Sequence, residues 1–513
     1  MFLGDKVFEC SSNIRMFFKK RKKSNIWKWF FGSCFVVLIT FLVFSYYAIR
    51  NFDLSSVIDN NFLQNTIRAE LNEGQNKILD VVPVVFGFTK PKTYLFLFQN
   101  NTELRPGGGF IGVYAVVTVD RGKMEIVEVE GSGVLDKKTL ANWQPVPPEP
   151  ISKYLGVSQW YFSDGNWSPD FGESAKKVLE LYKGEGGVNA DDIDVVVGIT
   201  PTVLERLMNI TGDFTIDGIE FTSENVTEQL EYEVEYGYES KGMAFEDRKS
   251  IIRPFMEALV GHIKDNLFER YDDYYDVLFS LAHEKHLVFF SQASDLQTLV
   301  DNYGLSADVV ETNHDYVLWV DANLGALKTD HAITRSLNYT ISKRPASHES
   351  ESDRYLAATT MEYFHGGTFD WRTSTYLTYT RVYVPKDSKL VSIIGKRKNG
   401  QSIGIDEVDS GEELGKQWFG VYFAVEPGEI KSLSFIYQLP TNIAEDIVSN
   451  TYNLLVQKQI GTINHGLTLH LDFGKIIQSA KPAEEEQHWG DRVYEYKGDL
   501  RLDRKFNISL KAD

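Results

Sequence analysis

The hydrophobic and polar positions divide the chain into an apolar run, a region of mixed periodicity and a region of strands. The apolar run covers residues 29–49, which carry no charge and are bracketed by Lys28 and Arg50. A helix of this length spans about 30 Å, enough to cross a bilayer. Five basic residues at 19–23 precede it. We therefore predict a basic cytoplasmic segment at 1–26 and one transmembrane helix at 27–49, with the bulk of the chain extracytoplasmic.

A cleaved signal peptide is the alternative to this anchor. Such a peptide has a shorter apolar region that ends in a small-x-small cleavage site. The sequence Tyr46-Tyr47-Ala48 instead places a large residue where a small one is needed. The pattern favours a retained anchor.

Residues 50–330 combine helical and strand periodicity. Helical spacing of apolar residues predicts a juxtamembrane stalk helix at 50–84. Within 85–330, we expect strands at 93–98, 110–119, 124–129, 193–200, 286–291 and 316–320, with helices at 173–182, 203–208, 248–268, 274–283 and 295–303. Strands that alternate with helices predict a sheet covered by helices, an α/β domain at 85–330.

The pattern changes after residue 331, where strand periodicity replaces helical periodicity. Strands are predicted at 331–343, 354–364, 375–384, 417–425, 431–438, 451–458 and 466–473. Seven strands joined by short turns predict an all-β antiparallel sandwich at 331–475. Residues 476–513 form a charged C-terminal extension, either an edge addition or a tail.

Charge and cysteine content restrict the classes of function. The 513-residue chain has a net charge of −19, and residues 1–26 alone carry +5, which leaves −24 on the remainder. A region this acidic is a poor candidate for binding nucleic acid, which requires a basic surface. The two cysteines are Cys10 and Cys34, so the extracytoplasmic part has no disulfides. This pattern is typical of a bacterial or archaeal envelope protein.

The most unusual local feature is the string from Gln99 to Phe110, which lies between two predicted strands and contains three consecutive glycines. Backbone N–H groups of such a loop can turn toward one point and bind an anion. Arg105 could add a bidentate contact to phosphate, which makes it the candidate catalytic residue. The candidate ligand-binding residues of this string are Asn100, Glu103, Gly107, Gly108 and Gly109. The alternative is a turn whose arginine pairs with Glu103.

A second string, residues 163–171, places Asp164 and Asp170 close to each other along the chain. Their carboxylates are the ligands that Mg²⁺ or Ca²⁺ prefers, so we predict a metal site there, with Mg²⁺ as the cofactor. Aspartate also favours turns and helix N-caps, which is the alternative use of each residue.

A third string, residues 321–330, follows the last predicted strand of the α/β region. Ligands often bind beyond the carboxyl ends of strands in open α/β sheets. Asn323 and Lys328 are therefore candidate ligand-binding residues, and a linker between domains is the alternative. A serine acyl-enzyme is a further hypothesis, because Ser174-Ala175-Lys176-Lys177 reads Ser-x-x-Lys.

Several strings are similar to one bacterial family. They are FLFQNNTELRPGGGFIG, NWSPDF, IDVVVGITPTVLERLMNITG, DANLGALKTD, YTRVYVP, FAVEPGEIKSLSFIYQLP and YNLLVQKQIG. Together they resemble the membrane-anchored family known as domain of unknown function 4012, over residues 85–475. That family has no assigned activity, so the resemblance implies architecture and source.

A more distant likeness concerns residues 193–216, which look like the corresponding part of LytR-CpsA-Psr proteins. Those proteins transfer glycopolymers from a polyprenyl-pyrophosphate carrier to the cell wall. The likeness implies that Arg105 contacts pyrophosphate and that Asp164 or Asp170 binds Mg²⁺. The ELRPGGG string departs from the pattern of that family.

These features predict a single-pass protein of the plasma membrane, part of the bacterial cell envelope. It would bind or transfer a phosphate-linked glycopolymer, with a cell-wall polymer or a polyprenyl-linked glycan as its partner. The alternative is a non-catalytic scaffold or adhesion protein whose β-sandwich binds a partner or a glycan.

Overall fold

The computed structural model describes residues 84–139, 142–243, 248, 250–267, 269–344, 354–463 and 465–512. The predicted transmembrane helix at 27–49, the basic segment before it and all but the last residue of the predicted stalk lie outside the described residues. No helix within the described ranges is both long and apolar enough to span a bilayer.

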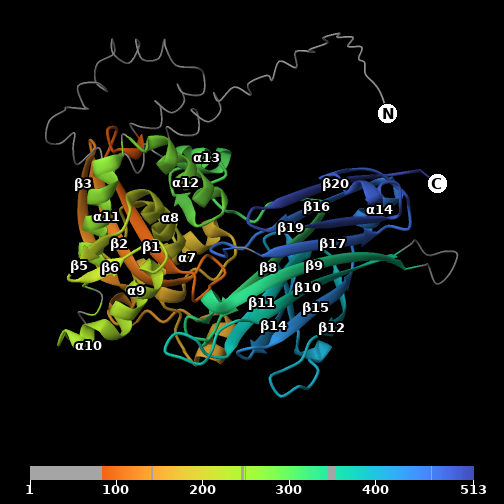
Figure 1. The fold of residues 1–513 in the computed structure, drawn as a ribbon, viewed down its shortest axis with the longest axis horizontal. Helices are drawn as coiled ribbons and strands as arrows, with labels where there is room; N and C mark the ends of the chain where they lie inside the picture. The colour runs from red at the N-terminus through yellow and green to blue at the C-terminus, as the bar shows by residue number, and fades with distance from the viewer. Residues whose placement is uncertain are drawn as a thin grey trace, which may run out of the picture.

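The first part of the structure is a five-stranded sheet with helices on both faces (Figure 1). Its strands are β1 (Lys92–Asn100), β2 (Phe110–Asp120), β3 (Lys123–Gly131), β4 (Ile193–Ile199) and β7 (Leu287–Ser291). Its helices include α5 (Ser132–Asp136), α6 (Glu149–Leu155), α7 (Phe171–Gly184), α8 (Pro201–Thr211), α9 (Val226–Tyr232), α10 (Tyr238–Ser240), α11 (Ile252–Asn266), α12 (Tyr271–His283) and α13 (Ser294–Asn302). A small hairpin, β5 (Phe214–Ile216) and β6 (Ile219–Phe221), and the π-helical segment η2 (Glu233–Gly237) complete it.

The strand order is β3-β2-β1-β4-β7, and β1 and β4 are parallel while the other pairs are antiparallel. Side chains alternate between the two faces of β1, as expected of a strand covered on both sides. Leu95 and Leu97 pack with α7, whereas Tyr94 packs with α8, α11 and α12. The predicted α/β architecture is confirmed in these elements.

The second part contains two sheets that enclose one core. The six-stranded sheet has the order β12-β15-β10-β9-β17-β19, and the seven-stranded sheet has the order β13-β14-β11-β8-β16-β20-β18. The strands are β8 (Asp315–Asn323), β9 (Ile333–Arg344), β10 (Arg354–His365), β11 (Tyr376–Pro385), β12 (Lys389–Ile394), β13 (Asp409–Glu413), β14 (Lys416–Val425), β15 (Ile430–Gln438), β16 (Thr451–Gln457), β17 (Gly466–Asp472), β18 (Ile477–Lys481), β19 (Val493–Asp499) and β20 (Arg504–Leu510). The core between the sheets includes Trp319 from one and Phe435 from the other, at 5.6 Å between ring centroids.

All seven predicted strands of this region are present, but three other expectations were wrong. The pattern places Tyr316–Val320 in the first part, whereas β8 pairs with β11 and β16 in the second. The sheets are not purely antiparallel, because β16 runs parallel to β8 and β17 to β9. A helix, α14 (Thr441–Val448), buries Ile443 and Ile447 against the core where no helix was expected.

The C-terminal extension supplies strands to both sheets. β18 and β20 lie in the seven-stranded sheet and β19 lies in the six-stranded sheet. Phe506 and Leu510 are buried in the core of the second part. This segment is therefore integral to the second part.

The two parts lie side by side (Figure 1). At their junction, side chains of each part contact the other. Ile460, from the loop after β16, is buried in the core beneath α7. Lys458 donates a hydrogen bond of 2.8 Å to the carbonyl of Glu284, and Lys285 forms an ion pair with Asp503. Trp167 from the first part packs with Tyr379 of the second.

Candidate functional site

The three strings singled out in the sequence meet at this junction. Arg105 Nε donates a hydrogen bond of 2.7 Å to Asp164 Oδ1, which joins the first string to the second. Arg105 Nη1 also donates to the carbonyl of Asn323 at 2.7 Å, which joins the first string to the third. The main chains of Leu104 and Asn323 are joined as well, by a hydrogen bond of 2.9 Å.

Arg105 lies in the interior, with 1% of its surface exposed. Its Nη2 donates to Glu103 Oε1 at 3.1 Å, and its guanidinium lies 5.3 Å from the ring centroid of Phe110. Burial acts to lower the pKa of Arg105, but the carboxylates of Asp164 and Glu103 outweigh it and raise the pKa. Burial also raises the pKa of Glu103. A ligand phosphate would therefore have to displace carboxylates that already occupy the guanidinium.

The glycine-rich loop directs backbone N–H groups into the protein. Gly107 N donates to the carbonyl of Asn166 at 2.9 Å, and Gly108 N donates to the carbonyl of Arg105 at 3.0 Å. The carbonyl of Gly109 accepts from Asn166 Nδ2 at 2.7 Å. A Cβ on Gly107 would lie 2.7 Å from Ser174 Oγ, so the glycines permit close packing against the second string and α7.

The two candidate metal ligands have separate structural partners. Asp164 binds Arg105, whereas Asp170 is the N-cap of α7 and accepts a hydrogen bond from Glu173 N at 3.0 Å. Asp170 Oδ2 also accepts from Val309 N at 2.8 Å. Across the described residues, no group of three or more His, Cys, Asp or Glu could hold a metal ion. The Mg²⁺ site stays a prediction.

The remaining sequence candidates lie around the same junction. Asn100 Nδ2 donates to Glu231 Oε1 at 2.8 Å, and Lys328 forms an ion pair of 3.2 Å with Glu235. Asn323 Nδ2 donates to Asp330 Oδ2 at 3.0 Å. These contacts tie the first and third strings to α9 and η2.

Ser174, the nucleophile of the acyl-enzyme hypothesis, lies inside α7. Its hydroxyl donates to the carbonyl of Ser168 at 2.8 Å, and 1% of its surface is exposed. Lys177, the last residue of the Ser-x-x-Lys string, instead pairs with Glu180 on the outside of the helix. The serine and the lysine thus point to different environments.

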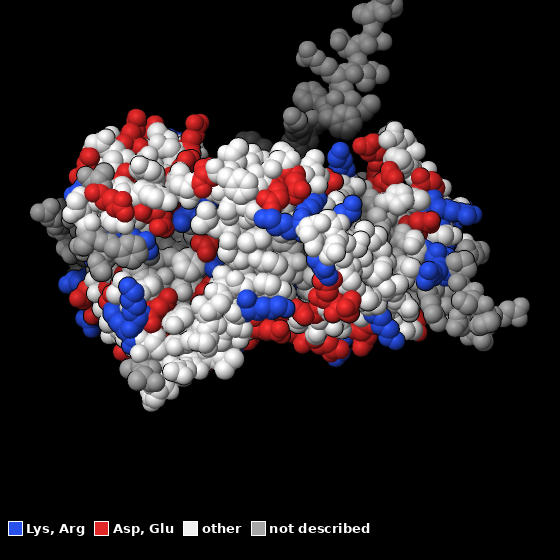
Figure 2. Space-filling model, turned by 90° about the horizontal axis from the view of Figure 1, so that it is seen from below, with Lys and Arg blue, Asp and Glu red and all other residues white. Residues whose placement is uncertain are grey.

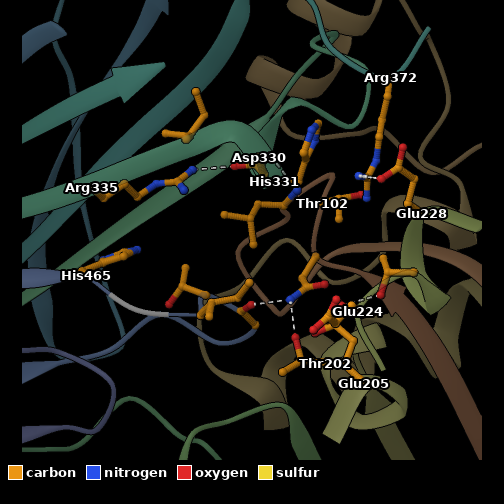
Figure 3. A pocket seen from close by; sticks show the side chains of 17 residues that line it. Thr102, Thr202, Glu205, Glu224, Glu228, Asp330, His331, Arg335, Arg372 and His465 are labelled. Carbon is orange, nitrogen blue, oxygen red and sulfur yellow. Dashed lines mark hydrogen bonds and ion pairs between the residues drawn. The ribbon is translucent and has the colours of Figure 1, made fainter. Parts of the chain in front are cut away.

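A cavity of about 230 Å³ opens beside the three strings, between the two parts. Both parts line it with polar side chains and few apolar ones (Figure 3). Its lining includes Asn101, Thr102, Leu104, Thr202, Glu205, Glu224, Thr227, Glu228, Asp330, His331, Ile333, Arg335, Arg372, Gly461, Thr462, Ile463 and His465.

The wall from the second part is held by a buried charge network. Arg335 Nε donates to Asp321 Oδ2 at 2.8 Å, and Arg335 Nη2 pairs with Asp330. Asp330 in turn accepts a hydrogen bond from Leu104 N at 3.1 Å. The guanidinium of Arg335 is therefore neutralised by two carboxylates before any ligand arrives.

His465 lies in this wall with 4% of its surface exposed, and its Nε2 has no hydrogen-bond partner. Burial, with the nearby charges of Arg335 and Lys458, lowers the pKa of His465 well below its usual value. The imidazole is thus neutral at physiological pH. The Nε2 nitrogen is itself enclosed by the protein, so it is a buried polar atom that the fold leaves unsatisfied.

The opposite wall, from α8, α9 and the loop before α9, is acidic (Figure 3). Glu205, Glu224 and Glu228 line it, and Glu228 has 63% of its side chain exposed. Arg372, from the loop between β10 and β11, lies 3.7 Å from Glu228 and 2.6 Å from Glu231. This cation is shared between two carboxylates, so the wall keeps an excess of negative charge.

The cavity contains residues that the sequence patterns did not single out. Thr202 and Glu205 lie on α8, Glu228 lies on α9, and Arg372 and His465 lie in two separate loops. The sequence pointed to the cavity only through Thr102 and Asp330, which line it and belong to the first and third strings. Their partners could not be read without the fold.

The face of the molecule seen in Figure 2 carries acidic side chains in several groups, with basic ones beside them. On the described residues of that face, no extended basic surface is visible. The exclusion of nucleic acid as a partner stays a prediction, which rests on the acidic net charge.

Residues 89–235 match the model of a family described as a protein of unknown function (DUF4012). The resemblance to the domain of unknown function 4012 family is confirmed. The match covers β1 to α9 and most of η2, and therefore the first and second strings. The third string and the second part of the structure lie beyond it. The likeness to LytR-CpsA-Psr proteins stays a prediction.

No curated protein matches the chain. Among solved structures, an M1 zinc metallopeptidase from Deinococcus radiodurans is similar over 36% of this chain and 43% of that one, with 9% identity and a TM-score of 0.17. A variant of that enzyme is similar over 35% and 43%, with 11% identity and a TM-score of 0.14. This chain thus spans less than half of those enzymes, and likenesses of this size say nothing about its activity.

Proposed function

We propose that this protein is a membrane-anchored component of the bacterial envelope that binds an uncharged, hydroxyl-rich glycan in the junction cavity. The anchor rests on the apolar run at 29–49 and the basic block before it. The ligand class rests on the cavity. The observation that carries it is the lining of this cavity, which combines uncharged hydrogen-bonding side chains with a wall of carboxylates and with arginines that are already paired.

The hydrogen-bonding groups of the cavity suit hydroxyls. A sugar hydroxyl can donate to Glu205 or Glu228 and accept at the same time from a donor such as Arg372. The threonine hydroxyls of the lining can take either role, because each can both donate and accept a hydrogen bond. A ligand with several hydroxyls could therefore satisfy both walls at once.

The charges of the cavity disfavour a phosphate group. Arg335 and Arg372 are the arginines of its lining, and each is already paired with acidic side chains. Arg105 is enclosed by Asp164 and Glu103. A pyrophosphate would meet the excess carboxylates of the acidic wall, and like charges at short range repel. Binding of a glycan is therefore better supported than transfer from a pyrophosphate carrier.

The test is isothermal titration calorimetry of the full chain in detergent, with neutral mono- and oligosaccharides of glucose, galactose and N-acetylglucosamine as probes. We expect at least one series to bind. Glu228→Gln should weaken that binding about tenfold, the value of one hydrogen bond to a charged group. Glu407→Gln, which changes an exposed carboxylate paired with Arg397 elsewhere on the second part, is the matched control and should bind as the wild type does.

A second titration uses Mg²⁺ with inorganic pyrophosphate. If this probe binds, the neutral sugars do not, and Arg105→Lys abolishes the heat, the proposal is overturned in favour of a phosphate-handling site. If no sugar binds and no pyrophosphate binds, the glycan proposal also fails. The non-catalytic partner-binding hypothesis for the β-sandwich would then be tested by pull-down.

A further inference from the structure

Three aromatic side chains form a cluster at the surface beside the junction cavity. Tyr232 and Tyr236 have 44% and 43% of their surfaces exposed, and Trp371 is half-buried. The Trp371 ring lies 5.7 Å from that of Tyr232 and 5.6 Å from that of Tyr236, between ring centroids. Both contacts are edge-to-face, at 77° and 83°, and the two tyrosine rings lie 6.0 Å apart. We call these three residues the aromatic platform.

The platform and the acidic wall share one face of a helix. Glu228, Tyr232 and Tyr236 follow one another at intervals of four residues through α9 and η2, so their side chains point the same way. Glu231 is on the same side, because it contacts Arg372, the residue next to Trp371. Along this contact, Glu228 and Glu231 of the helix face Arg372 of the loop. Tyr232 and Tyr236 of the helix face Trp371.

The platform adjoins the lining of the cavity through these neighbours. Glu228 and Arg372 line the cavity, and each lies on the same segment as a platform ring. We infer that a ligand longer than the cavity would extend past Glu228 and Arg372 to Tyr232 and Trp371. Exposed aromatic rings gathered at the mouth of a polar cavity are typical of a binding surface.

The combination suits a sugar ring. A pyranose presents an apolar C–H face that can stack on a large aromatic ring, and its edge carries hydroxyls. Tyrosine and tryptophan supply large contact area from rigid side chains, so little conformational entropy is lost on binding. Glu228 and Arg372, at the border of the platform, can bond the hydroxyls on the edge.

We propose that the aromatic platform is a second subsite, which stacks a sugar unit of an oligosaccharide whose end lies in the junction cavity. This inference rests on the proposed function and extends it: the natural ligand is a chain of sugars, bound over at least two units.

The alternative role for the platform is structural, because Trp371 belongs to the second part and the tyrosines to the first. A contact that only holds the two parts together would affect the fold and every ligand alike. A subsite would affect long ligands and leave short ones unchanged. Ligand length therefore separates the two roles.

The experiment measures affinity along a ladder of one to six units, in the neutral sugar series that the full chain binds. We expect affinity to rise by about tenfold or more as the ligand lengthens from one unit to three, and then to level off. Trp371→Ala should remove that rise and leave the one-unit affinity within about twofold of the wild type. Tyr236→Ser, an exposed helix position, is a second variant that keeps the tryptophan and should reduce the rise in part.

The matched control is Trp489→Ala, which removes a tryptophan that is 65% exposed on the second part and lies outside the cavity lining. It should leave the whole ladder unchanged. The inference is overturned if sugars bind with no dependence on length, or if the Trp371 and Tyr236 variants weaken all lengths equally. Absence of binding by every sugar instead overturns the proposed function, and this inference with it.

Discussion

The guanidinium of Arg105 and the carboxylate of Asp164 lie 2.7 Å apart in the interior, although 59 residues separate them in the sequence. Each was a candidate for contact with a ligand, and in the structure each is the other's partner. The same guanidinium donates to the carbonyl of Asn323, so one side chain connects three segments and both parts of the molecule.

This arrangement predicts that Arg105→Ala destabilises the fold. The substitution leaves the carboxylate of Asp164 and the carbonyl of Asn323 buried without their donor. Removal of one partner of a buried ion pair costs about 3–5 kcal/mol. We expect a marked fall in the melting temperature of the full chain in detergent, measured by circular dichroism.

Arg397→Ala is the control, since it removes an exposed arginine that is paired with Glu407. It should leave the melting temperature unchanged. If Arg105→Ala instead melts as the wild type does and only loses binding of a ligand, Arg105 is a ligand contact after all.

The junction predicts a second effect at Gly461. Its φ is +79°, and a Cβ there would lie 2.1 Å from the carbonyl oxygen of Gly108 in the other part. Gly400 has nearly the same φ, +81°, but open space around its Cβ position. Both glycine-to-alanine variants incur backbone strain of about 1–2 kcal/mol. Only Gly461→Ala adds a steric clash, of about 1–3 kcal/mol.

The measurement is the urea midpoint of each variant. Gly461→Ala should unfold at clearly lower urea than Gly400→Ala. Equal midpoints would mean that the two parts separate easily enough to absorb the added methyl group.

Lys458 predicts a pH dependence of stability. Burial, together with the nearby charge of Lys285, lowers the pKa of Lys458 from 10.5 to about 7. Between these values the folded state holds the lysine neutral while the unfolded state binds a proton. The free energy of unfolding should therefore rise with pH across this window, by about 1.4 kcal/mol per pH unit for one proton.

The contribution of Lys458 to the free energy of unfolding is fully present above pH 10.5, the pKa of the unfolded state. It is lost as the pH falls toward about 7, the pKa of the folded state. Unfolding of wild type and of Lys458→Met, followed in urea from pH 7 to pH 9.5, measures it. The rise of the unfolding free energy with pH that Lys458 causes should be absent in the variant. Lys511→Met, at an exposed position near the C-terminus, should keep the wild-type slope.

Asp136 and Glu185 predict the opposite slope. Glu185 is fully buried, and its Oε1 accepts a hydrogen bond from Phe162 N at 2.8 Å. Burial raises the pKa of both carboxyls, and the proximity of Asp136 raises that of Glu185 further. The folded state thus keeps a proton that the unfolded state has already lost, so stability falls as the pH rises above the ordinary range of a carboxylate.

Glu185→Gln keeps the acceptor oxygen for Phe162 and removes the titration. We expect it to be more stable than the wild type at pH 9 and to lose this part of the pH dependence, as measured by urea unfolding from pH 5 to pH 9. Glu180→Gln, on the exposed side of α7, should follow the wild type. A wild-type slope in Glu185→Gln would assign the titration to other groups.

Much of the secondary structure could be predicted because it depends on local periodicity. The apolar run of β1 and the seven strands after residue 331 are examples, as is the start of α7 after Asp170. The assignment of β8 failed, since a fully buried strand looks the same in either part. Helix α14 was missed because its eight residues are too short for helical periodicity to stand out.

The candidate site was also predicted only as far as it depends on local sequence. The strings around Arg105, Asp164 and Asn323 were recognisable as unusual, because glycine runs and clustered polar residues interrupt the apolar pattern. Their local patterns indicated ligand chemistry, but they could not show that the three strings serve as partners for one another. The cavity beside them was not predicted, because Glu228, Arg372 and His465 come from three distant elements.

The sequence by itself determined the periodicity of most elements, the acidic charge of the chain and the resemblance of residues 89–235 to a family of unknown function. These properties depend on neighbours along the chain, or on composition alone. Only the tertiary structure decided where charges are neutralised and where they are left over. Arg105 is enclosed by carboxylates from two strings, whereas Glu228 stays exposed beside Arg372. The energy of a buried charge depends on what surrounds it in space, and that surrounding comes from segments far apart in the sequence.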